Sequence, residues 1–330
     1  MADRIVVAGA GSVGCLMGGL LALGGRRVAL LARPDLAAAI GAHGLRVTDL
    51  DGLDAALPPG ALEASADPAV LDGAGIVLVT VKSRDTAAMA DLIAAHAPAE
   101  ALVVSLQNGV GNADALRARL AGRTVLAGMV PFNVLRKDGP WVHRGTTGSI
   151  VIEDRPGMAA RLGVPHLPIE TSRDMPGVLW GKLLFNLNNA LNALSGLPLR
   201  EQLERRAWRR ALAAQIAEAL GLLRLSGVAP VLAGPLPPRL VPAALRLPTP
   251  LYRLIAARSL RIDPEARSSM WEDLQRGRPT EVDQLQGAVL DLARQLGRDA
   301  PVNRRVLERV RAAERAGAGA PRLRPEEVMA

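Results

Sequence analysis

The sequence contains few of the residues on which disulfide-rich folds, metal centres and base-stacking surfaces depend. Among its 330 residues there is one cysteine, Cys15, so no disulfide framework can form within the chain. The four histidines show no i,i+4 pairing and no carboxylate at metal-ligand spacing, which argues against a zinc site. Two phenylalanines, one tyrosine and four tryptophans leave few platforms for stacking nucleic-acid bases.

The sequence also lacks long apolar runs and clustered charge. Although 49% of the residues are hydrophobic, no uninterrupted apolar run approaches the roughly 18 to 20 residues that cross a bilayer. The N-terminus leads into an apolar run that is too short for a signal peptide. We therefore expect a cytoplasmic protein without membrane contact. The formal charge of +8 comes mostly from scattered arginines, so we expect no nucleic-acid partner.

The length and the order of apolar patterns predict two domains, at residues 1–172 and 173–330. A single hydrophobic core rarely grows beyond about 250 residues. In the first part, strands alternate with helices, which predicts a parallel sheet of the Rossmann type covered on both faces. Short runs between Thr124 and Glu153 predict further strands that close this sheet. The main strands are expected at residues 5–8, 28–32, 76–81 and 102–106.

After Ser172 the strand pattern disappears, and helical periodicities predict an all-α C-terminal domain. A proline-rich stretch between Val228 and Pro250 cannot be one helix, because each proline removes a backbone donor and clashes with the preceding turn. It is either a surface insert or a lid. The helices are expected at residues 178–194, 200–226, 250–277 and 280–297.

A glycine motif of the form G-x-G-x-x-G follows the first strand and opens the first helix. Its first glycine permits a tight turn, its second lets the backbone approach a pyrophosphate, and its third lets helix and strand pack closely. The amides and the helix dipole at this N-terminus favour an anion. We predict a dinucleotide site here, with a flexible glycine turn as the alternative. The motif consists of Gly9, Ala10, Gly11, Ser12, Val13 and Gly14.

The end of the second strand predicts which dinucleotide binds. An NAD enzyme usually carries an acidic residue here for the ribose 2'-hydroxyl, whereas this chain has Arg33 after Ala32. An arginine can pair with a 2'-phosphate, which favours NADP(H) as the cofactor. Asp35 lies close enough in sequence to leave NAD open, and a solvated loop arginine is the alternative interpretation of Arg33.

Two polar features follow apolar strands at the sheet edge where open α/β folds bind ligands. Lys82 comes directly after the strand at 76–81, and Gln107-Asn108-Gly109 follows the strand at 102–106. We expect both features to face the same crevice. For the second, a plain Asn-Gly turn is an equal alternative.

A helix at the start of the second domain carries Lys182, Asn186 and Asn189 on one face. Because asparagine is unfavourable inside helices, this density of asparagines indicates a polar surface that contacts a ligand. A buried network between packed helices is the alternative. From the residues alone, Lys182 is the first candidate for an acid.

Near the C-terminus, the residues alone assign no special role to Glu281 or Ser269. Thr280 can cap a helix, with Glu281 as a favourable acidic group in its first turn. Ser269 is compatible with an ordinary helix surface.

Together these features resemble the ketopantoate reductase (2-dehydropantoate 2-reductase) family over most of the chain, from Gly9 to about Pro301. The most specific mark is the segment from Ser268-Ser269-Met270-Trp271 to Thr280-Glu281-Val282-Asp283. The others are the glycine motif, Thr80-Val81-Lys82, Gln107-Asn108-Gly109, and Lys182 with Asn186 one turn later.

The resemblance implies a Rossmann domain joined to an all-α domain, with NADPH reducing ketopantoate to (R)-pantoate for pantothenate and coenzyme A synthesis. It implies that Lys182 is the general acid that protonates the developing alkoxide, and that Glu281 holds this lysine and a substrate hydroxyl. It also implies binding roles: Lys82 and Asn108 at the nicotinamide and substrate crevice, Asn186 and Ser269 on the substrate, and Arg33 on the 2'-phosphate.

One departure from the family concerns the substrate. Ketopantoate-reducing members typically carry Asn-Pro where this chain has Ala190 and Leu191. Asn188, Asn189 and Asn192 are nearby candidates to compensate, although on a helix they point in different directions. Reduction of another small 2-oxo acid is therefore the alternative activity.

A noncatalytic dinucleotide sensor is the competing class of function, and the presence of both Lys182 and Glu281 argues against it. Symmetric homodimers are the commonest oligomers, but no pattern in this sequence indicates whether the chain forms one.

Overall fold

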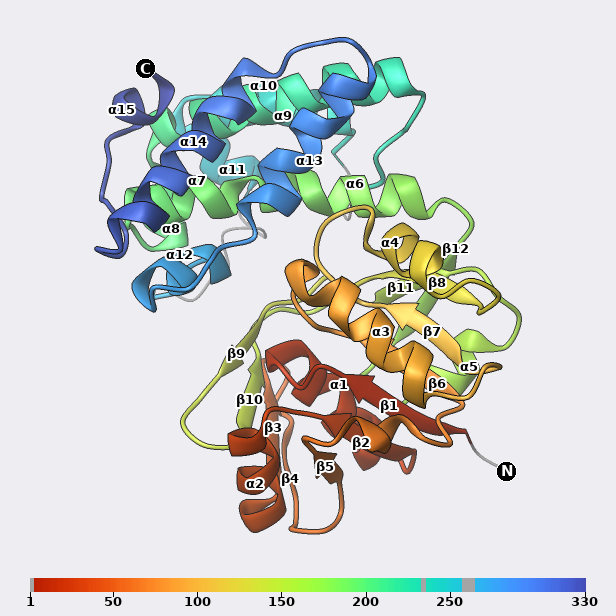
Figure 1. Cartoon of the computed structure of the whole chain (residues 1–330). Coiled ribbons are helices and arrows are strands. Elements are labelled where there is room, and N and C mark those ends of the chain that lie inside the picture. The colour runs from red at the N-terminus through yellow and green to blue at the C-terminus, as the bar shows by residue number, and fades with distance from the viewer. Residues whose placement is uncertain (1–2, 233–235, 257–264) are drawn as a thin grey trace. The chain divides into compact units, whose positions relative to one another are not determined.

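Two units make up the chain, residues 1–175 and residues 176–330 (Figure 1). The computed structural model describes residues 3–232, 236–256 and 265–330. All strands that it describes lie in the first unit, and the second unit is helical over its described residues. None of the described helices is long and apolar enough to cross a membrane.

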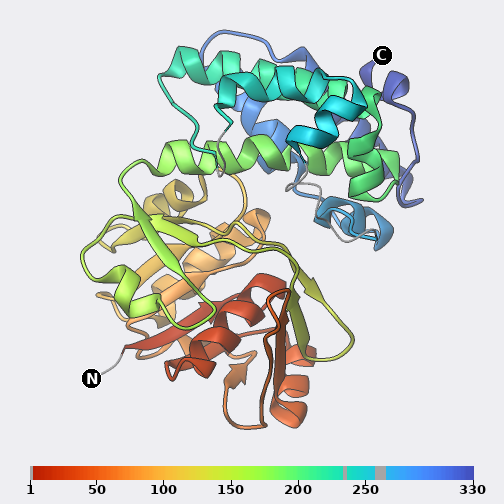
Figure 2. The ribbon, with the colours of Figure 1, turned by 180° about the vertical axis from the view of Figure 1, so that it is seen from behind.

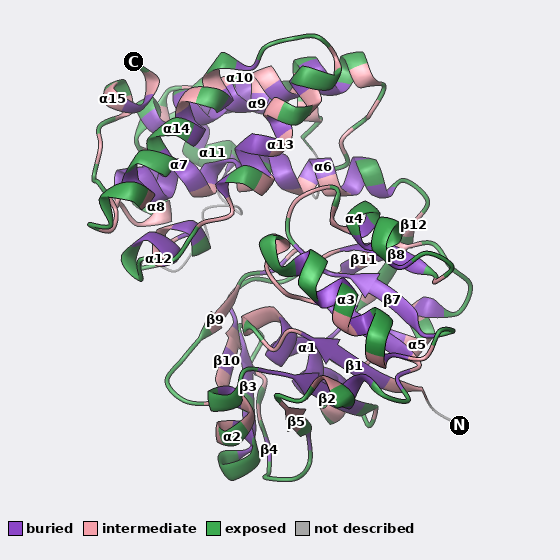
Figure 3. Ribbon diagram, viewed as in Figure 1, coloured by how far each residue is buried: buried purple, intermediate pink, exposed green. Residues whose placement is uncertain are grey.

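The first unit is built on an eight-stranded sheet with strand order β12-β11-β8-β7-β6-β1-β2-β5. The neighbouring strands β5, β2, β1, β6, β7 and β8 all run parallel. β11 is antiparallel to β8, and β12 is parallel to β11. Every residue of β6 and β7 is buried, as expected for parallel strands covered on both faces (Figure 3). The strands are β1 (Arg4–Ala8), β2 (Arg27–Leu31), β5 (Glu63–Ser65), β6 (Ile76–Val79), β7 (Leu102–Ser105), β8 (Val125–Met129), β11 (Ile150–Glu153) and β12 (Ile169–Ser172).

Helices cover both faces of this sheet, because the chain leaves β1 in one direction along the sheet and β6 in the other. Right-handed crossovers then place α1 on one face and the mutually packed α3 and α4 on the opposite face (Figures 1 and 2). The predicted Rossmann-type architecture is confirmed. The helices are α1 (Ser12–Leu23), α2 (Pro34–His43), α3 (Thr86–His96), α4 (Asn112–Arg119) and α5 (Met158–Leu162), with 3-10 turns η1 (Pro68–Leu71) and η2 (Ser83–Asp85).

A second, four-stranded sheet was not foreseen from the sequence. Its order is β4-β3-β10-β9, formed by β3 (Leu45–Asp49), β4 (Asp54–Leu57), β9 (Val134–Arg136) and β10 (Trp141–Arg144). It packs on α1, where a Cβ atom at Gly19 would lie only 2.6 Å from Val47. The expectation that all strands between Thr124 and Glu153 close the main sheet was therefore wrong for β9 and β10, which pair around β3 instead.

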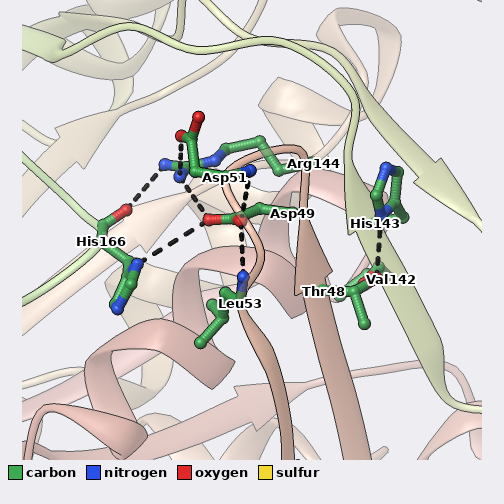
Figure 4. A network of polar contacts seen from close by, with 8 residues as sticks. All are labelled: Thr48, Asp49, Asp51, Leu53, Val142, His143, Arg144 and His166. Carbon is green, nitrogen blue, oxygen red and sulfur yellow. Dashed lines mark hydrogen bonds and ion pairs between the residues drawn. The ribbon is translucent and has the colours of Figure 1, made fainter.

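A buried ion pair ties this second sheet to the turn before β12 (Figure 4). The Arg144 guanidinium donates to Asp49 Oδ2 at 2.6 Å and to the His166 carbonyl at 2.7 Å. The side chains of Asp49 and Arg144 are 1% and 6% exposed. Burial alone would raise the pKa of Asp49, but the backbone N–H groups of Leu53 and Asp51 and the charge of Arg144 lower it overall.

The helices of the second unit differ from the predicted ones mainly because several predicted helices are interrupted. The helix expected at 178–194 divides at Leu187, and the one at 200–226 divides at Arg205. The helix expected at 250–277 is two helices, at 249–255 and 269–275, and residues 257–264 between them lie outside the described residues. The helices are α6 (Met175–Asn186), α7 (Asn188–Ser195), α8 (Leu199–Glu204), α9 (Arg206–Ser226), α10 (Val241–Arg246), α11 (Thr249–Ile255), α12 (Ser269–Gln275), α13 (Val282–Gln295), α14 (Pro301–Ala316) and α15 (Pro325–Met329), with η3 (Pro238–Leu240).

The proline-rich stretch contains η3 and α10, and α10 packs on α9. Arg209 of α9 is fully buried and donates to the carbonyls of Leu245 and Leu247 at the end of α10. The same guanidinium donates to the carbonyls of Leu203 and Glu204 at the end of α8. One buried arginine thus satisfies the carbonyls at two helix C-termini. Pro235 lies outside the described residues.

We expect Asp49→Asn to destabilise the first unit by about 3 kcal/mol at neutral pH, because it leaves the buried Arg144 without its anion. Since folding lowers the pKa of Asp49, its contribution is present above the ordinary carboxyl pKa near 4 and is lost as pH falls through the lower folded value. Urea unfolding at neutral pH and below about pH 3 measures both effects. Asp114→Asn, in an exposed ion pair, is the control. Equal losses in the two variants would contradict the assignment.

Candidate active site

The glycine loop after β1 is closed by backbone contacts. The N–H groups of Gly9 and Ala10 donate to the carbonyl of Leu31 at 3.2 and 3.0 Å. Gly9 has φ +110°, a conformation that favours glycine, and a Cβ there would lie 2.6 Å from Val81. A Cβ at Gly14 would overlap the carbonyl oxygen of Gly9. Two of the three motif glycines are therefore required by close packing, Gly9 against the segment after β6 and Gly14 against the end of β1.

Gly11 differs from the other two motif glycines. It is the exposed N-cap of α1, it supplies no side chain to cap the helix, and a Cβ there would meet nothing within 4 Å. The packing of the protein therefore does not require a glycine at this position, whereas close approach of a ligand would. Half-buried Ser12 and Val13 follow in the first turn. Amides at an uncapped helix N-terminus fit a pyrophosphate, so this loop suits a dinucleotide.

The structure brings the ends of β6 and β7 to this loop. Thr80 donates from its hydroxyl to the carbonyl of Gly9 at 2.6 Å. Gln107 is buried and donates to the carbonyl of Val81 at 3.1 Å and to the hydroxyl of Thr86 at 2.7 Å. Gln107 therefore holds the segment that leads into Lys82, which is half-buried.

Asn108 lies on the surface at the end of β7, with its backbone held in place. Its carbonyl accepts from Asn112 Nδ2 at 2.8 Å and from Ser83 Oγ at 3.2 Å. Asn112 also donates to Ser83, so three residues join the two strand ends. Ser83 and Asn112 were not predicted from the sequence, where only their positions next to the two strand-end motifs could have indicated them.

Arg33 follows β2 and occupies the N-cap of α2, where it is exposed and makes no side-chain capping bond. β2 is parallel to β1 and adjacent to it, so Arg33 lies at the same sheet edge as the glycine loop. This position suits a contact with a 2'-phosphate.

In the second unit, Lys182 and Asn186 lie one turn apart on α6 and are both half-buried. Burial lowers the pKa of Lys182 from 10.5 to about 8. A lysine with this pKa is largely protonated at neutral pH and can still release its proton in a reaction.

Glu281 occupies the N-cap of α13, one residue later than the Thr280 cap that we expected. The Thr280 hydroxyl accepts from the N–H of Val282, and the Glu281 carboxylate makes no capping bond. The Glu281 carboxylate therefore does not cap the helix, but it still lies at a helix N-terminus, where a negative charge is favourable. Ser269 begins α12 and is exposed, whereas its neighbour Ser268 caps that helix by accepting from the N–H of Trp271.

The asparagines near Ala190 serve the interior of the helical unit. Asn188 exchanges hydrogen bonds with Gln202 at 2.9 and 3.3 Å, and Asn192 donates to the same Gln202 at 3.1 Å. Ala190 and Leu191 are fully buried. Of the asparagines for which a buried network was the alternative, Asn188 belongs to one, and Asn192 extends it. Neither residue replaces the asparagine that ketopantoate-reducing members typically carry at the position of Ala190.

Because packing requires a glycine at position 14 but not at position 11, substitutions at the two positions should affect stability and NADPH binding differently. We expect Gly11→Ala to keep the melting temperature while weakening NADPH binding at least about tenfold, because the new methyl projects toward the ligand side. Gly14→Ala, which overlaps the carbonyl of Gly9, is expected to lower both. Thermal unfolding and NADPH fluorescence titration measure the two effects, and full affinity in Gly11→Ala would refute the pyrophosphate site.

Known families and solved structures agree with this architecture. The family model "Ketopantoate reductase PanE/ApbA" matches residues 5–157, and "Ketopantoate reductase PanE/ApbA C terminal" matches residues 174–314. A 2-dehydropantoate 2-reductase of Halobacterium salinarum is 31% identical over 324 residues, covering 95% of this chain and 100% of the relative. One of Archaeoglobus fulgidus is 29% identical, covering 94% and 98%.

Among solved structures, a PanE/ApbA family ketopantoate reductase from Ralstonia eutropha is 34% identical with a TM-score of 0.81, covering 95% of this chain and 99% of that one. A D-mandelate dehydrogenase with NADH and anilino(oxo)acetate, 19% identical, shares the fold with a TM-score of 0.76 over 95% and 99%. The predicted resemblance and the predicted enzyme class are both confirmed. The chain belongs to the ketopantoate reductase family of oxidoreductases.

Proposed function

We propose that this protein reduces 2-dehydropantoate (ketopantoate) to (R)-pantoate with NADPH, in the cytoplasm and as a step toward pantothenate and coenzyme A. The observation that carries the proposal is Lys182, a half-buried lysine with a pKa lowered to about 8 by burial. It lies in a chain whose first unit has the loop geometry for a dinucleotide. Support comes from curated relatives named 2-dehydropantoate 2-reductase that match over nearly the whole chain.

The cofactor site is assigned to the glycine loop from Gly9 to Gly14 and to Arg33. The amides at the start of α1, next to Gly11, would hold the pyrophosphate, and Arg33 would pair with the 2'-phosphate. When bound, NADPH supplies a hydride. Lys82 and Asn108, at the ends of β6 and β7, contact the nicotinamide or the substrate.

Lys182 supplies the proton. As hydride adds to C2 of the 2-oxo acid, the carbonyl π electrons move to its oxygen, and Lys182 Nζ transfers a proton to that oxygen to give the hydroxyl. Lys182 is left neutral and recovers a proton from solvent. Glu281 holds the lysine and a substrate hydroxyl, while Asn186 and Ser269 bind the substrate.

Another small 2-oxo acid is the second candidate substrate, and the buried Ala190 and Leu191 favour it. No asparagine side chain stands at position 190, and the nearby Asn188 and Asn192 are used by Gln202. NADPH oxidation with ketopantoate, pyruvate and 2-oxoisovalerate in parallel separates the two candidates. The highest kcat/KM with ketopantoate supports the first, and NADPH binding without ketopantoate turnover favours the second.

The assembly proposed with this activity is a homodimer. Symmetric dimers are the commonest oligomers, and a solved ketopantoate reductase from Staphylococcus aureus is described as dimeric.

The pKa of Lys182 predicts the pH dependence of the reduction. Because the protonated lysine is the acid, we expect the rate to be high below about pH 8 and to fall as pH rises through that value. Lys182→Ala is expected to lower kcat by roughly 100- to 10,000-fold while NADPH binding is kept. Steady-state kinetics against pH and an NADPH titration of the variant measure both. Unchanged turnover in Lys182→Ala would reject the assigned acid.

Arg33 predicts the preference between the two nicotinamide cofactors. We expect Arg33→Ala to raise KM for NADPH by roughly tenfold, because a charge-assisted hydrogen bond contributes about 1.5 kcal/mol or more. KM for NADH, which lacks the 2'-phosphate, should change less than about twofold. Arg27→Ala, which removes an exposed arginine at the opposite end of β2 from Arg33, is the control. A parallel rise for both cofactors would show that Arg33 does not contact the 2'-phosphate.

A further inference from the structure

Gln286 connects the helix that begins at Glu281 to the helix pair that carries Lys182. It is fully buried on α13, and its side-chain nitrogen donates to the carbonyl of Leu187 at 3.0 Å. Leu187 is the break between α6 and α7. The same nitrogen donates to Gln215 Oε1 on α9 at 3.0 Å. Because a backbone carbonyl can only accept, the amide nitrogen must face Leu187.

Asn192 makes the equivalent connection for the segment that carries Ser269. It is fully buried on α7, and its Oδ1 accepts from the backbone N–H of Ser268 at 2.9 Å. Its Nδ2 donates to Gln202 Oε1 at 3.1 Å and to the carbonyl of Leu197 at 2.9 Å. Three of its four hydrogen-bonding positions are therefore used inside the protein.

Ser268 completes the attachment of α12 to α7, which pack on each other (Figure 1). Its hydroxyl donates to the carbonyl of Asn189 at 3.1 Å and accepts from the N–H of Trp271 at 3.1 Å. Ser269 is the next residue in the chain and is exposed. A shift of Ser268 relative to α7 would therefore carry Ser269 with it.

We propose that Gln286 and Asn192 are positioning residues, which hold Glu281 and Ser269 in register with Lys182 and Asn186 on the α6–α7 helix pair. The proposal rests on the proposed function, which assigns the roles of the four positioned residues. Glu281 precedes Gln286 by five residues, so the rigid first turns of α13 transmit the bond at Leu187 to the carboxylate. Buried, directional hydrogen bonds of this kind select one packing arrangement.

Substitutions of Gln286 and of Asn192 should change different kinetic parameters, because Glu281 and Ser269 have different proposed roles. Displacing Glu281 disturbs the proton donor and so lowers kcat, and displacements of about 1 Å can cost roughly 100-fold. Displacing Ser269 weakens substrate binding and so raises KM. Substitution of a residue with only a structural role would lower stability without separating an effect on kcat from an effect on KM.

The test compares Gln286→Met and Asn192→Leu, which keep the side-chain length and remove the amide, with Asn303→Leu as the control. Asn303 is a fully buried amide that joins α14 to α9 through the Gln215 carbonyl and the Glu218 carboxylate. It holds none of the four positioned residues. Melting temperatures, kcat, KM for the 2-oxo acid and the alkaline limb of the kcat profile are measured for each.

We expect Gln286→Met to lower kcat at least about tenfold, to raise KM by a smaller factor because Glu281 also holds a substrate hydroxyl, and to move the alkaline limb to lower pH because the carboxylate is less well placed beside the lysine. Asn192→Leu should raise KM about tenfold and keep kcat within about threefold. Asn303→Leu should change only the melting temperature. The proposal is overturned if Gln286→Met leaves kcat unchanged and Asn192→Leu leaves KM unchanged. It is also overturned if Asn303→Leu changes kcat and KM as much as these two variants do. A variant that does not fold is replaced by its alanine counterpart, with the same outcomes.

Failure of the proposed function would be visible separately, as a wild-type protein without turnover of any 2-oxo acid. The positioning of Glu281 is then read without substrate, from the pH dependence of Lys182 acetylation followed by mass spectrometry. We expect Gln286→Met to lower the midpoint by about half a unit, with no change in Asn192→Leu or Asn303→Leu. A midpoint in Gln286→Met equal to that of the wild type would overturn the proposal.

Discussion

A close backbone contact between α1 and the end of β1 fixes the geometry on which the proposed cofactor site depends. Gly14 leaves no room for a side chain beside the carbonyl of Gly9, and the same carbonyl accepts from the hydroxyl of Thr80. The second sheet then packs on the far part of α1 at Gly19. One helix is therefore held by two sheets, so its uncapped N-terminus, the proposed anion site, would cost little to organise when a ligand binds.

Burial disfavours the charged forms of both Asp49 and Lys182, but the net shift of the pKa favours the charged form only at Asp49. Asp49 remains ionised because Arg144 and two backbone N–H groups outweigh the cost of burial, and Arg144 also joins the second sheet to the rest of the unit through the His166 carbonyl. At Lys182 burial is the cause that lowers the pKa, so the ammonium is held in a state that releases its proton more easily. The first arrangement favours stability and the second favours chemistry.

The sequence predicted the parts of the fold that local patterns determine. The parallel strands, the glycine loop and the helical second half follow from periodicity and from turn chemistry. The pairing of β9 and β10 with β3 did not, because the partner of a short strand is decided by tertiary packing on α1. The breaks at Leu187 and Arg205 were missed because helical periodicity continues across them. Asn192 and Gln286 resemble ordinary polar helix residues in sequence, and only their buried partners distinguish them.

The account depends on one chemical event, the transfer of hydride to C2 of ketopantoate in this protein. The most direct measurement uses NADPH deuterated at the transferring position of nicotinamide C4, with the product analysed by mass spectrometry and NMR. The account predicts (R)-pantoate that carries one deuterium at C2 for each NADPH oxidised. NADPH oxidation without labelled pantoate, or no reaction with ketopantoate, would contradict it.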